Sequence, residues 1–285
     1  MAIDYERLKG RQFPDIVLHY GWRDSALYAL GLGLGSDPLD ETELRYVYER
    51  HMQALPTMAT VLGHPGFWVA EPDVGINFRK ILHGEQDMEI FRPLAPEATL
   101  VARHRVEEII DKGEGRGAIL KVRRDLIDQM SGELQSTQVT AMFCRDDGGF
   151  GGPQIAAPPP IAIPDRAPDW SVTRATLPQA ALIYRLSGDF NPLHADPAVA
   201  RDAGFERPIL HGLATFGVAG FALLLACADG DAAAMRKMSC RFAAPVLPGE
   251  TLRTDIWDAQ DCVLFRCTVA ERGTIVLDHG KAVFA

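Results

Sequence analysis

The sequence is poor in the residue patterns that hold disulfides or metal ions. Its 285 residues contain five cysteines, an odd number without a Cys-x-x-Cys pair, and its eight histidines include no His-Glu-x-x-His motif. Unclustered cysteines in odd number favour reduced, buried thiols over a disulfide framework. Without ligand spacings we also expect no metal. The sequence therefore predicts a cytoplasmic protein that does not depend on a metal.

Positive charge and long apolar segments are scarce as well. The formal net charge of −9 argues against binding to nucleic acids or anionic membranes, although locally clustered cations could still hold an anionic ligand. The longest apolar run, Gly212 to Ala228, is short for a membrane span. The N-terminus lacks the layout of a signal peptide, and the C-terminus is not a Ser-Lys-Leu-type peroxisomal address. We expect no nucleic-acid partner and no membrane.

Proline is plentiful in one stretch, where it divides the chain. Prolines recur from Pro153 to Pro168, a composition typical of a stiff, extended linker. The sequence thus predicts a first half at residues 1–152, a linker at 153–169 and a second half at 170–285.

The two halves repeat one another in outline. Tyr28-Ala-Leu matches Tyr184-Arg-Leu at an offset of 156 residues, and the Phe91 segment matches the Phe242 segment at an offset of 151. A nearly constant offset over separate segments predicts a duplication. The halves differ in chemistry, because glycines of the first half stand where the second half carries Asp189. The first half is therefore expected to lack proton-transfer groups.

Hydrophobic patterning predicts an α+β fold in which an antiparallel sheet wraps around a central helix in each half. The apolar run from Gly212 has no polar face and must be surrounded on every side. A charged helix is expected from Glu41 to Leu55, and Thr57 to Leu62 should take the place of the buried helix in the first half. Strands are expected at residues 63–69, 99–106, 117–125, 132–143, 237–242, 251–259, 262–271 and 274–284.

The stretch from Tyr184 to Gly220 carries the candidate chemistry. Asp189 and His194 are bridged by Asn191 and a proline, and His211-Gly212 opens the apolar run. A carboxylate, an imidazole and a backbone N–H at a helix start can move protons beside a carbonyl. The alternative is structural, since Asp and Asn also cap turns and an isolated histidine is often a core residue.

The string from Tyr184 to His194, Tyr-Arg-Leu-Ser-Gly-Asp-Phe-Asn-Pro-Leu-His, resembles the signature of the hydratase 2 (MaoC-like) family of hot-dog-fold enzymes. The resemblance implies two tandem hot-dog domains and reversible hydration of trans-2-enoyl-CoA to (3R)-3-hydroxyacyl-CoA. It implies no cofactor, because coenzyme A is part of the acyl-CoA thioester substrate. A homodimer is also expected from the family.

The resemblance assigns roles to individual residues. Asp189 and His194 hold a water and perform the acid and base steps, in an order that the sequence leaves open. Asn191 keeps the substrate or the pair in register, and the Gly212 N–H contacts the thioester oxygen. Substrate contacts are implied for His83, Gly84, Lys112, Phe190, Pro192, Leu193 and Phe242. Taken alone, His83-Gly84 could be an ordinary turn and Lys112 a solvated side chain.

Competing functions remain open at this point. A dehydratase acting on acyl-carrier-protein substrates, or a hydratase for a branched or dicarboxylic thioester, would need the same groups. A hot-dog thioesterase fits the signature less well. A non-catalytic acyl-CoA-binding subunit is a further alternative, since the first half shows that this fold can lose its acid and base.

Overall fold

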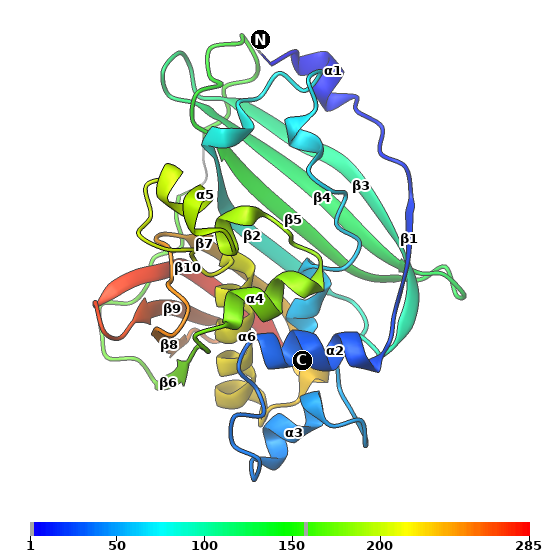
Figure 1. Ribbon diagram of the computed structural model, residues 1–285, viewed down its shortest axis with the longest axis vertical. Coiled ribbons are helices and arrows are strands. Elements are labelled where there is room, and N and C mark those ends of the chain that lie inside the picture. The colour runs from blue at the N-terminus through cyan, green and yellow to red at the C-terminus, as the bar shows by residue number, and fades with distance from the viewer. Residues whose placement is uncertain (1–2, 157–158) are drawn as a thin grey trace.

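The computed structural model describes residues 3–156 and 159–285, which form one antiparallel sheet of ten strands flanked by helices (Figure 1). The strand order is β1-β3-β4-β5-β2-β7-β10-β9-β8-β6. The first half supplies β1 (Ile16–Tyr20), β2 (Ile81–Ile90), β3 (Ala98–Asp111), β4 (Ala118–Asp128) and β5 (Leu134–Cys144). The second half supplies β6 (Trp170–Ala175), β7 (Met235–Phe242), β8 (Thr251–Asp258), β9 (Val263–Val269) and β10 (Thr274–Phe284).

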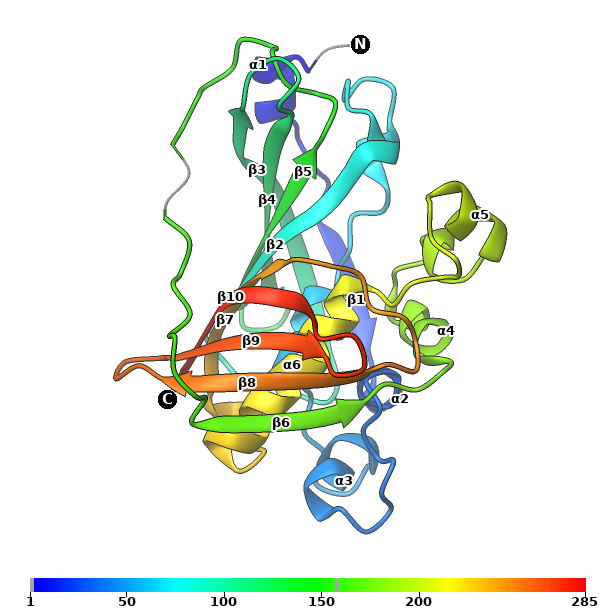
Figure 2. The same ribbon diagram turned by 90° about the vertical axis from the view of Figure 1, so that its left-hand side faces the viewer.

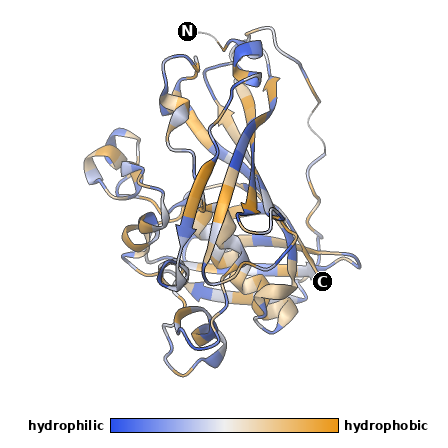
Figure 3. Cartoon of the chain, turned by 90° about the vertical axis from the view of Figure 1, so that its right-hand side faces the viewer, coloured by the Kyte–Doolittle hydropathy of each residue, from blue (hydrophilic) through white to orange (hydrophobic). Residues whose placement is uncertain are grey.

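The halves join in the middle of the sheet, where β2 pairs with β7 from Glu85 opposite Arg241 to Glu89 opposite Lys237. Much of the strands consists of hydrophobic residues, drawn in orange, whereas hydrophilic residues, drawn in blue, are scattered over the surrounding loops (Figure 3). The predicted strands of the meander and of the second half are present, with shifts of a few residues at most ends. β1, β2 and β6 were not predicted as strands. Charged residues interrupt the apolar pattern of β2, β1 has only five residues, and β6 is largely exposed.

The predicted helix from Gly212 is α6 (Gly212–Ala228), which crosses the sheet of the second half (Figure 2). It packs against β6, β7, β8 and β10, and Phe216 and Phe221 are fully buried. Gly217 and Gly220 allow the close approach of the first half. A Cβ at Gly217 would lie 2.7 Å from Leu32, and one at Gly220 would lie 2.6 Å from Thr57. The all-round apolar sequence is thus explained by neighbours on every side.

The remaining helices are short. They are α1 (Tyr5–Lys9), α2 (Trp22–Gly31), α3 (Glu41–Val47), α4 (Ala180–Tyr184) and α5 (Pro197–Asp202). Asp196 caps α5, since its carboxylate accepts from the Ala198 N–H at 2.7 Å.

Two expectations for the first half are wrong in extent. The helix from Glu41 ends at Val47 instead of Leu55, because Tyr48 turns extended and His51 adopts a positive φ of 57°. No strand forms at residues 63–69, where Gly63 and Gly66 have positive φ angles and a 3₁₀ turn, η2 (Trp68–Ala70), follows.

The central helix of the first half is reduced to one 3₁₀ turn, η1 (Pro56–Thr60), which contacts α6. Arg124 of β4 donates hydrogen bonds to the carbonyl oxygens of Ala59 and Thr60, so a polar contact holds η1 against the sheet. Shortening of this helix leaves room between the first-half sheet and the second half.

Residues 152–156 and 159–169 contain no helix or strand, and they descend along one side of the molecule (Figure 2). Residues 157 and 158 of the expected linker, like Met1 and Ala2, lie outside the described residues. The Ile161 carbonyl oxygen meets His279 Nδ1 at 2.7 Å, which ties the segment to β10.

Candidate active site

Asp189 and Asn191 occupy a tight turn between α4 and α5. Gly188 has a φ of 119°, which turns the chain after a 3₁₀ turn at Arg185–Ser187. The Asp189 carboxylate accepts from the Asn191 N–H at 3.1 Å, and the Asn191 side-chain oxygen accepts from the Leu193 N–H at 3.1 Å. The capping role considered from the sequence is therefore real, and it fixes the position of both side chains.

His194 ends the turn and lies buried beneath it. Its Nδ1 is 2.8 Å from the carbonyl oxygen of Ile209, which can only accept, so Nδ1 carries the hydrogen. Nε2 is then left with a lone pair. Burial lowers the pKa of His194 below its usual value, which keeps the ring neutral near pH 7. A neutral imidazole with a free Nε2 is suited to accept a proton.

His211 belongs to the same cluster, although the sequence suggested no role for it beyond preceding the helix. Its ring stacks on His194 with centroids 3.7 Å apart and planes 28° apart, and its Nε2 is 3.2 Å from the Asp189 carbonyl oxygen. Burial, and then the charge of His194, lower the pKa of His211 to about 4. Its place one residue before an apolar helix was the only signal available.

Potential ligand atoms of Asp189, His194 and His211 all lie within 4.8 Å of one another. Across residues 3–156 and 159–285 this is the one group of His, Cys, Asp and Glu side chains close enough to hold a metal ion. One nitrogen of each histidine is already engaged with a backbone carbonyl. The expected absence of a metal stays a prediction.

Gly212 begins α6 directly beside this cluster. An added Cβ would lie 3.1 Å from the Phe242 ring, and the Phe242 ring in turn lies 4.5 Å from the His83 ring between centroids. The start of a 17-residue helix carries partial positive charge and free N–H groups. The structure thus brings Gly212, Phe242 and His83 together.

Two cavities meet at His83, which lines both. One, of about 250 Å³, is lined by Asp189, Asn191 and Leu213 of the second half and by the first half. The other, of about 470 Å³, is lined by Gly84, Lys112 and Phe242 among others. A bulge in the pairing of β2 with β5, between His83 and Glu85, redirects the chain at this junction.

Phe190, Pro192 and Leu193 lie apart from these cavities. Phe190 is 60 % exposed and lines another hollow, which shares Val61, His64 and Gly188 with the 250 Å³ cavity. Pro192 and Leu193 form the 3₁₀ turn that ends in His194, and neither lines the two cavities. A direct substrate contact of these three residues stays a prediction.

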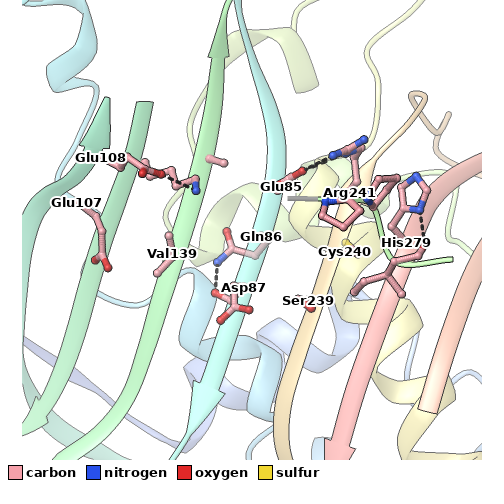
Figure 4. Close-up of a pocket in the computed structure, with 15 residues that line it drawn as sticks. Glu85, Gln86, Asp87, Glu107, Glu108, Val139, Ser239, Cys240, Arg241 and His279 are labelled. Atoms are coloured by element: carbon pink, nitrogen blue, oxygen red, sulfur yellow. Dashed lines mark hydrogen bonds and ion pairs between the residues drawn. The ribbon is translucent and has the colours of Figure 1, made fainter. Parts of the chain in front are cut away.

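A larger hollow of about 630 Å³ lies beside the linker, over β2 and β7 (Figure 4). Its cations are already paired, Arg241 with Glu85 at 2.7 Å and Lys121 with Glu108 at 2.7 Å. Lys121 and Arg241 also line the neighbouring 470 Å³ cavity, where Lys112 forms no ion pair with any residue in the described parts of the chain. Lys112 is therefore the cation that remains available to an anionic ligand.

Comparison with known families and structures decides the assignment. A model of the MFE-2 hydratase 2 N-terminal domain matches residues 18–146, and a model of the MaoC-like domain matches residues 161–279. The chain is 40 % identical to enoyl-CoA hydratase ChsH3 of Mycobacterium tuberculosis, over 90 % of each chain. The chain belongs to the MaoC-like hydratase 2 family. It is a hydro-lyase with a double hot-dog fold.

Further proteins are similar to the chain in sequence or in fold. Enoyl-CoA hydratase 2 of Arabidopsis thaliana, named as peroxisomal, is 39 % identical over 95 % of this chain and 92 % of its own length. The crystal structure of a MaoC-like dehydratase from Phytophthora capsici superposes with a TM-score of 0.86 at 33 % identity, covering 99 % of both chains. A Mycobacterium tuberculosis protein described as a double hot-dog fold shares the architecture at a TM-score of 0.54 and 16 % identity.

No helix in the described parts of this hydratase is long and apolar enough to cross a membrane. The five cysteines are free, with Cys144, Cys240 and Cys267 buried. Burial raises the pKa of the Cys144 and Cys267 thiols to about 12, so these thiols are protonated and unreactive at neutral pH.

Buried neutral histidines predict acid sensitivity of the fold. Burial is the main cause that lowers the pKa of His104 and of His211 to about 4. The unfolded chain takes up protons near pH 6.5 and the folded chain only near pH 4. Stability is therefore full above pH 6.5 and is lost as the pH falls toward 4, by roughly 1 kcal/mol per pH unit for each histidine.

Urea unfolding at pH 7 and pH 5 measures this loss. His104→Phe, which cannot be protonated, should flatten the pH dependence relative to the unchanged protein. Equal stability at the two pH values would contradict the expectation.

Proposed function

We propose that this protein catalyses the reversible hydration of trans-2-enoyl-CoA to (3R)-3-hydroxyacyl-CoA in fatty-acyl-CoA metabolism. The observation that carries the proposal is the convergence of Asp189, His194 and the start of α6 at Gly212, beside a cavity shared by the two halves. Relatives named enoyl-CoA hydratase support the same reaction.

In this mechanism Asp189 and His194 hold one water between them. One group accepts a proton from the water while the water oxygen bonds to C3, and the other, protonated at the start, donates its proton to C2. Return of the accepted proton to the donor restores both groups, so protons balance over the cycle. The C2–C3 double bond becomes a single bond, and negative charge builds transiently on the thioester oxygen. The Gly212 N–H and the positive end of α6 stabilise that charge.

The two cavities supply places for the two ends of the substrate. The 250 Å³ cavity adjoins Asp189 and is walled mainly by apolar side chains, which suits the acyl group. The 470 Å³ cavity contains Lys112 at its wall and suits coenzyme A. His83, common to both, would lie beside the thioester. His83, Gly84, Lys112 and Phe242 thus act in substrate binding. The same role is proposed for Phe190, Pro192 and Leu193, which belong to the turn around Asp189.

Removal of the Lys112 charge tests the placement of coenzyme A. Lys112→Met is expected to raise KM for an enoyl-CoA about 2- to 5-fold with little change in kcat, because a partly exposed ion pair contributes modestly. The corresponding pantetheine thioester, which lacks the nucleotide phosphates, should be unaffected. Lys237→Met is the matched control, because Lys237 pairs with Asp87 and does not line the 470 Å³ cavity. A fall in kcat with unchanged KM would contradict this role.

The reaction is tested by mixing the protein with trans-2-enoyl-CoA and following the loss of conjugated thioester absorbance. We expect turnover, and slower turnover with the matching acyl-carrier-protein thioester. Faster turnover of the carrier-protein substrate would instead identify a carrier-protein dehydratase. Tight binding of acyl-CoA without turnover would identify a binding subunit.

We further propose that the protein works as a cytoplasmic homodimer without a cofactor, with substrate binding in residues 1–152 and proton transfer in residues 170–285. The free thiols support a reducing compartment, and the family resemblance supports the dimer. Sedimentation equilibrium tests the dimer, and fractionation of the source cells tests the compartment, with recovery in peroxisomes as the contrary result.

A further inference from the structure

Arg124 is a buried cation without a buried anion. It is 7 % exposed and lines the 250 Å³ cavity next to Asp189. Its Nε donates to the Gln138 side-chain oxygen at 3.1 Å, and its Nη2 donates to the carbonyl oxygens of Ala59 and Thr60. All three partners are uncharged, and in the described parts of the chain no carboxylate forms an ion pair with Arg124.

The remaining donors of Arg124 are open to the cavity. Nη1 forms no hydrogen bond with any described residue. It is nevertheless accessible to solvent. Burial lowers the pKa of Arg124 to about 10, so the group still carries its charge at neutral pH. An uncompensated charge in such a site is costly, and an anionic ligand would relieve that cost.

His64 adds a second donor to the same cavity. Its Nδ1 accepts from the Gly66 N–H at 3.1 Å, so the hydrogen of the neutral ring lies on Nε2. Burial, and then the charge of Arg124, lower the pKa of His64 and keep it neutral. The other walls combine apolar side chains, among them Phe67, Trp68 and Leu213, with the polar side chains of Thr60, His83, Thr140, Asp189 and Asn191. In the described parts of the chain none of these polar side chains forms a hydrogen bond with Arg124 or with His64 Nε2, so two donors of the cavity are left for an acceptor on a ligand.

We propose that Arg124 and His64 recognise an oxygen acceptor on the acyl group of the substrate, a carboxylate in preference to a neutral oxygen. The inference rests on the proposed hydration and names its substrate class: acyl thioesters that carry an oxygen beyond the reacting carbons. A plain hydrocarbon chain would leave the guanidinium without a partner inside the cavity.

The test compares enoyl-CoA substrates of equal length that end in a carboxylate, a hydroxyl or a methyl group, over a series of lengths. At the length that reaches Arg124, we expect the highest kcat/KM for the carboxylate. Arg124→Met should lower kcat/KM for that substrate about 10- to 100-fold and leave the methyl-ended one nearly unchanged. Arg123→Met is the matched control, because Arg123 directly precedes Arg124 in β4 and pairs with Asp125.

His64→Phe is a second variant that leaves the contacts of Arg124 with η1 intact. It should lower kcat/KM for the carboxylate-ended substrate about 3- to 10-fold, and this result stands even if Arg124→Met does not fold. A preference of the unchanged protein for methyl ends at every length would overturn the proposal. So would an equal loss on both substrates in Arg124→Met, which would make Arg124 only a tether for η1.

Hydration of trans-2-butenoyl-CoA, whose chain is too short to carry a distal oxygen, separates this proposal from the proposed function. If trans-2-butenoyl-CoA is hydrated but the longer substrates show no selectivity for their chain ends, the recognition by Arg124 is refuted and the proposed hydration stands. Absence of turnover for trans-2-butenoyl-CoA and for every longer enoyl-CoA in the series refutes hydration. Calorimetric binding of saturated carboxylate-ended and methyl-ended acyl-CoA then still tests Arg124, with tighter binding of the carboxylate as the supporting result.

Discussion

Asp189→Asn and His194→Gln are each expected to lower kcat for enoyl-CoA hydration by about 10²- to 10⁴-fold, because each removes a group that transfers a proton. The fold should persist in Asp189→Asn, since an amide oxygen can still accept from the Asn191 N–H that the carboxylate now binds at 3.1 Å. Initial rates of both variants, with circular dichroism to verify folding, measure the effect.

The matched control for the carboxylate is Asp196→Asn. Asp196 also caps a helix in this segment, with its carboxylate 2.7 Å from the Ala198 N–H. It is exposed and does not line the 250 Å³ cavity. Because Asp189 and His194 act on one water, the double variant should be little worse than the poorer single variant. Near-full turnover by Asp189→Asn would remove the carboxylate from the mechanism.

Gly212→Val is expected to lower kcat by about 10²-fold, because its side chain would press on the Phe242 ring and displace the first N–H of α6. The closest approach of an added Cβ to that ring is already 3.1 Å. Measurement of kcat and KM on a short enoyl-CoA distinguishes loss of transition-state stabilisation from loss of binding.

Addition of Phe242→Leu should recover part of the activity of Gly212→Val, since a smaller side chain makes room at the helix start. Phe242→Leu alone serves as the control. A rise in KM with kcat unchanged would assign Gly212 to substrate binding, and the thioester oxygen would then need another donor.

The turn from Gly188 to His194 was predictable because its signal is local. Asp189, Asn191 and His194 lie within one short segment, and the apolar run fixes the start of α6 at Gly212. Close approach of these groups follows from chain connectivity and from the hydrogen bonds that cap the turn. Their catalytic roles remain to be tested by the substitutions above.

The cavity beyond the turn was not predictable, because distant segments build it. Arg124 reaches Thr60 across 64 residues of sequence, and the stacking of His211 on His194 requires the intervening chain to fold back. For the reduced helix at η1, the sequence predicted only that Thr57–Leu62 would take the place that the buried helix has in the second half. Local pattern cannot show where a buried polar group points.

The most direct test of the account is the configuration of the hydration product. The product formed from trans-2-enoyl-CoA is offered to an R-specific and to an S-specific 3-hydroxyacyl-CoA dehydrogenase. A single configuration is predicted, because Asp189 and His194 hold the water on one face of the bound substrate, and the resemblance to hydratase 2 enzymes implies oxidation by the R-specific enzyme alone. Oxidation by the S-specific enzyme would still show that the protein is a hydratase, but it would contradict the proposed arrangement of Asp189, His194 and Gly212 around the substrate.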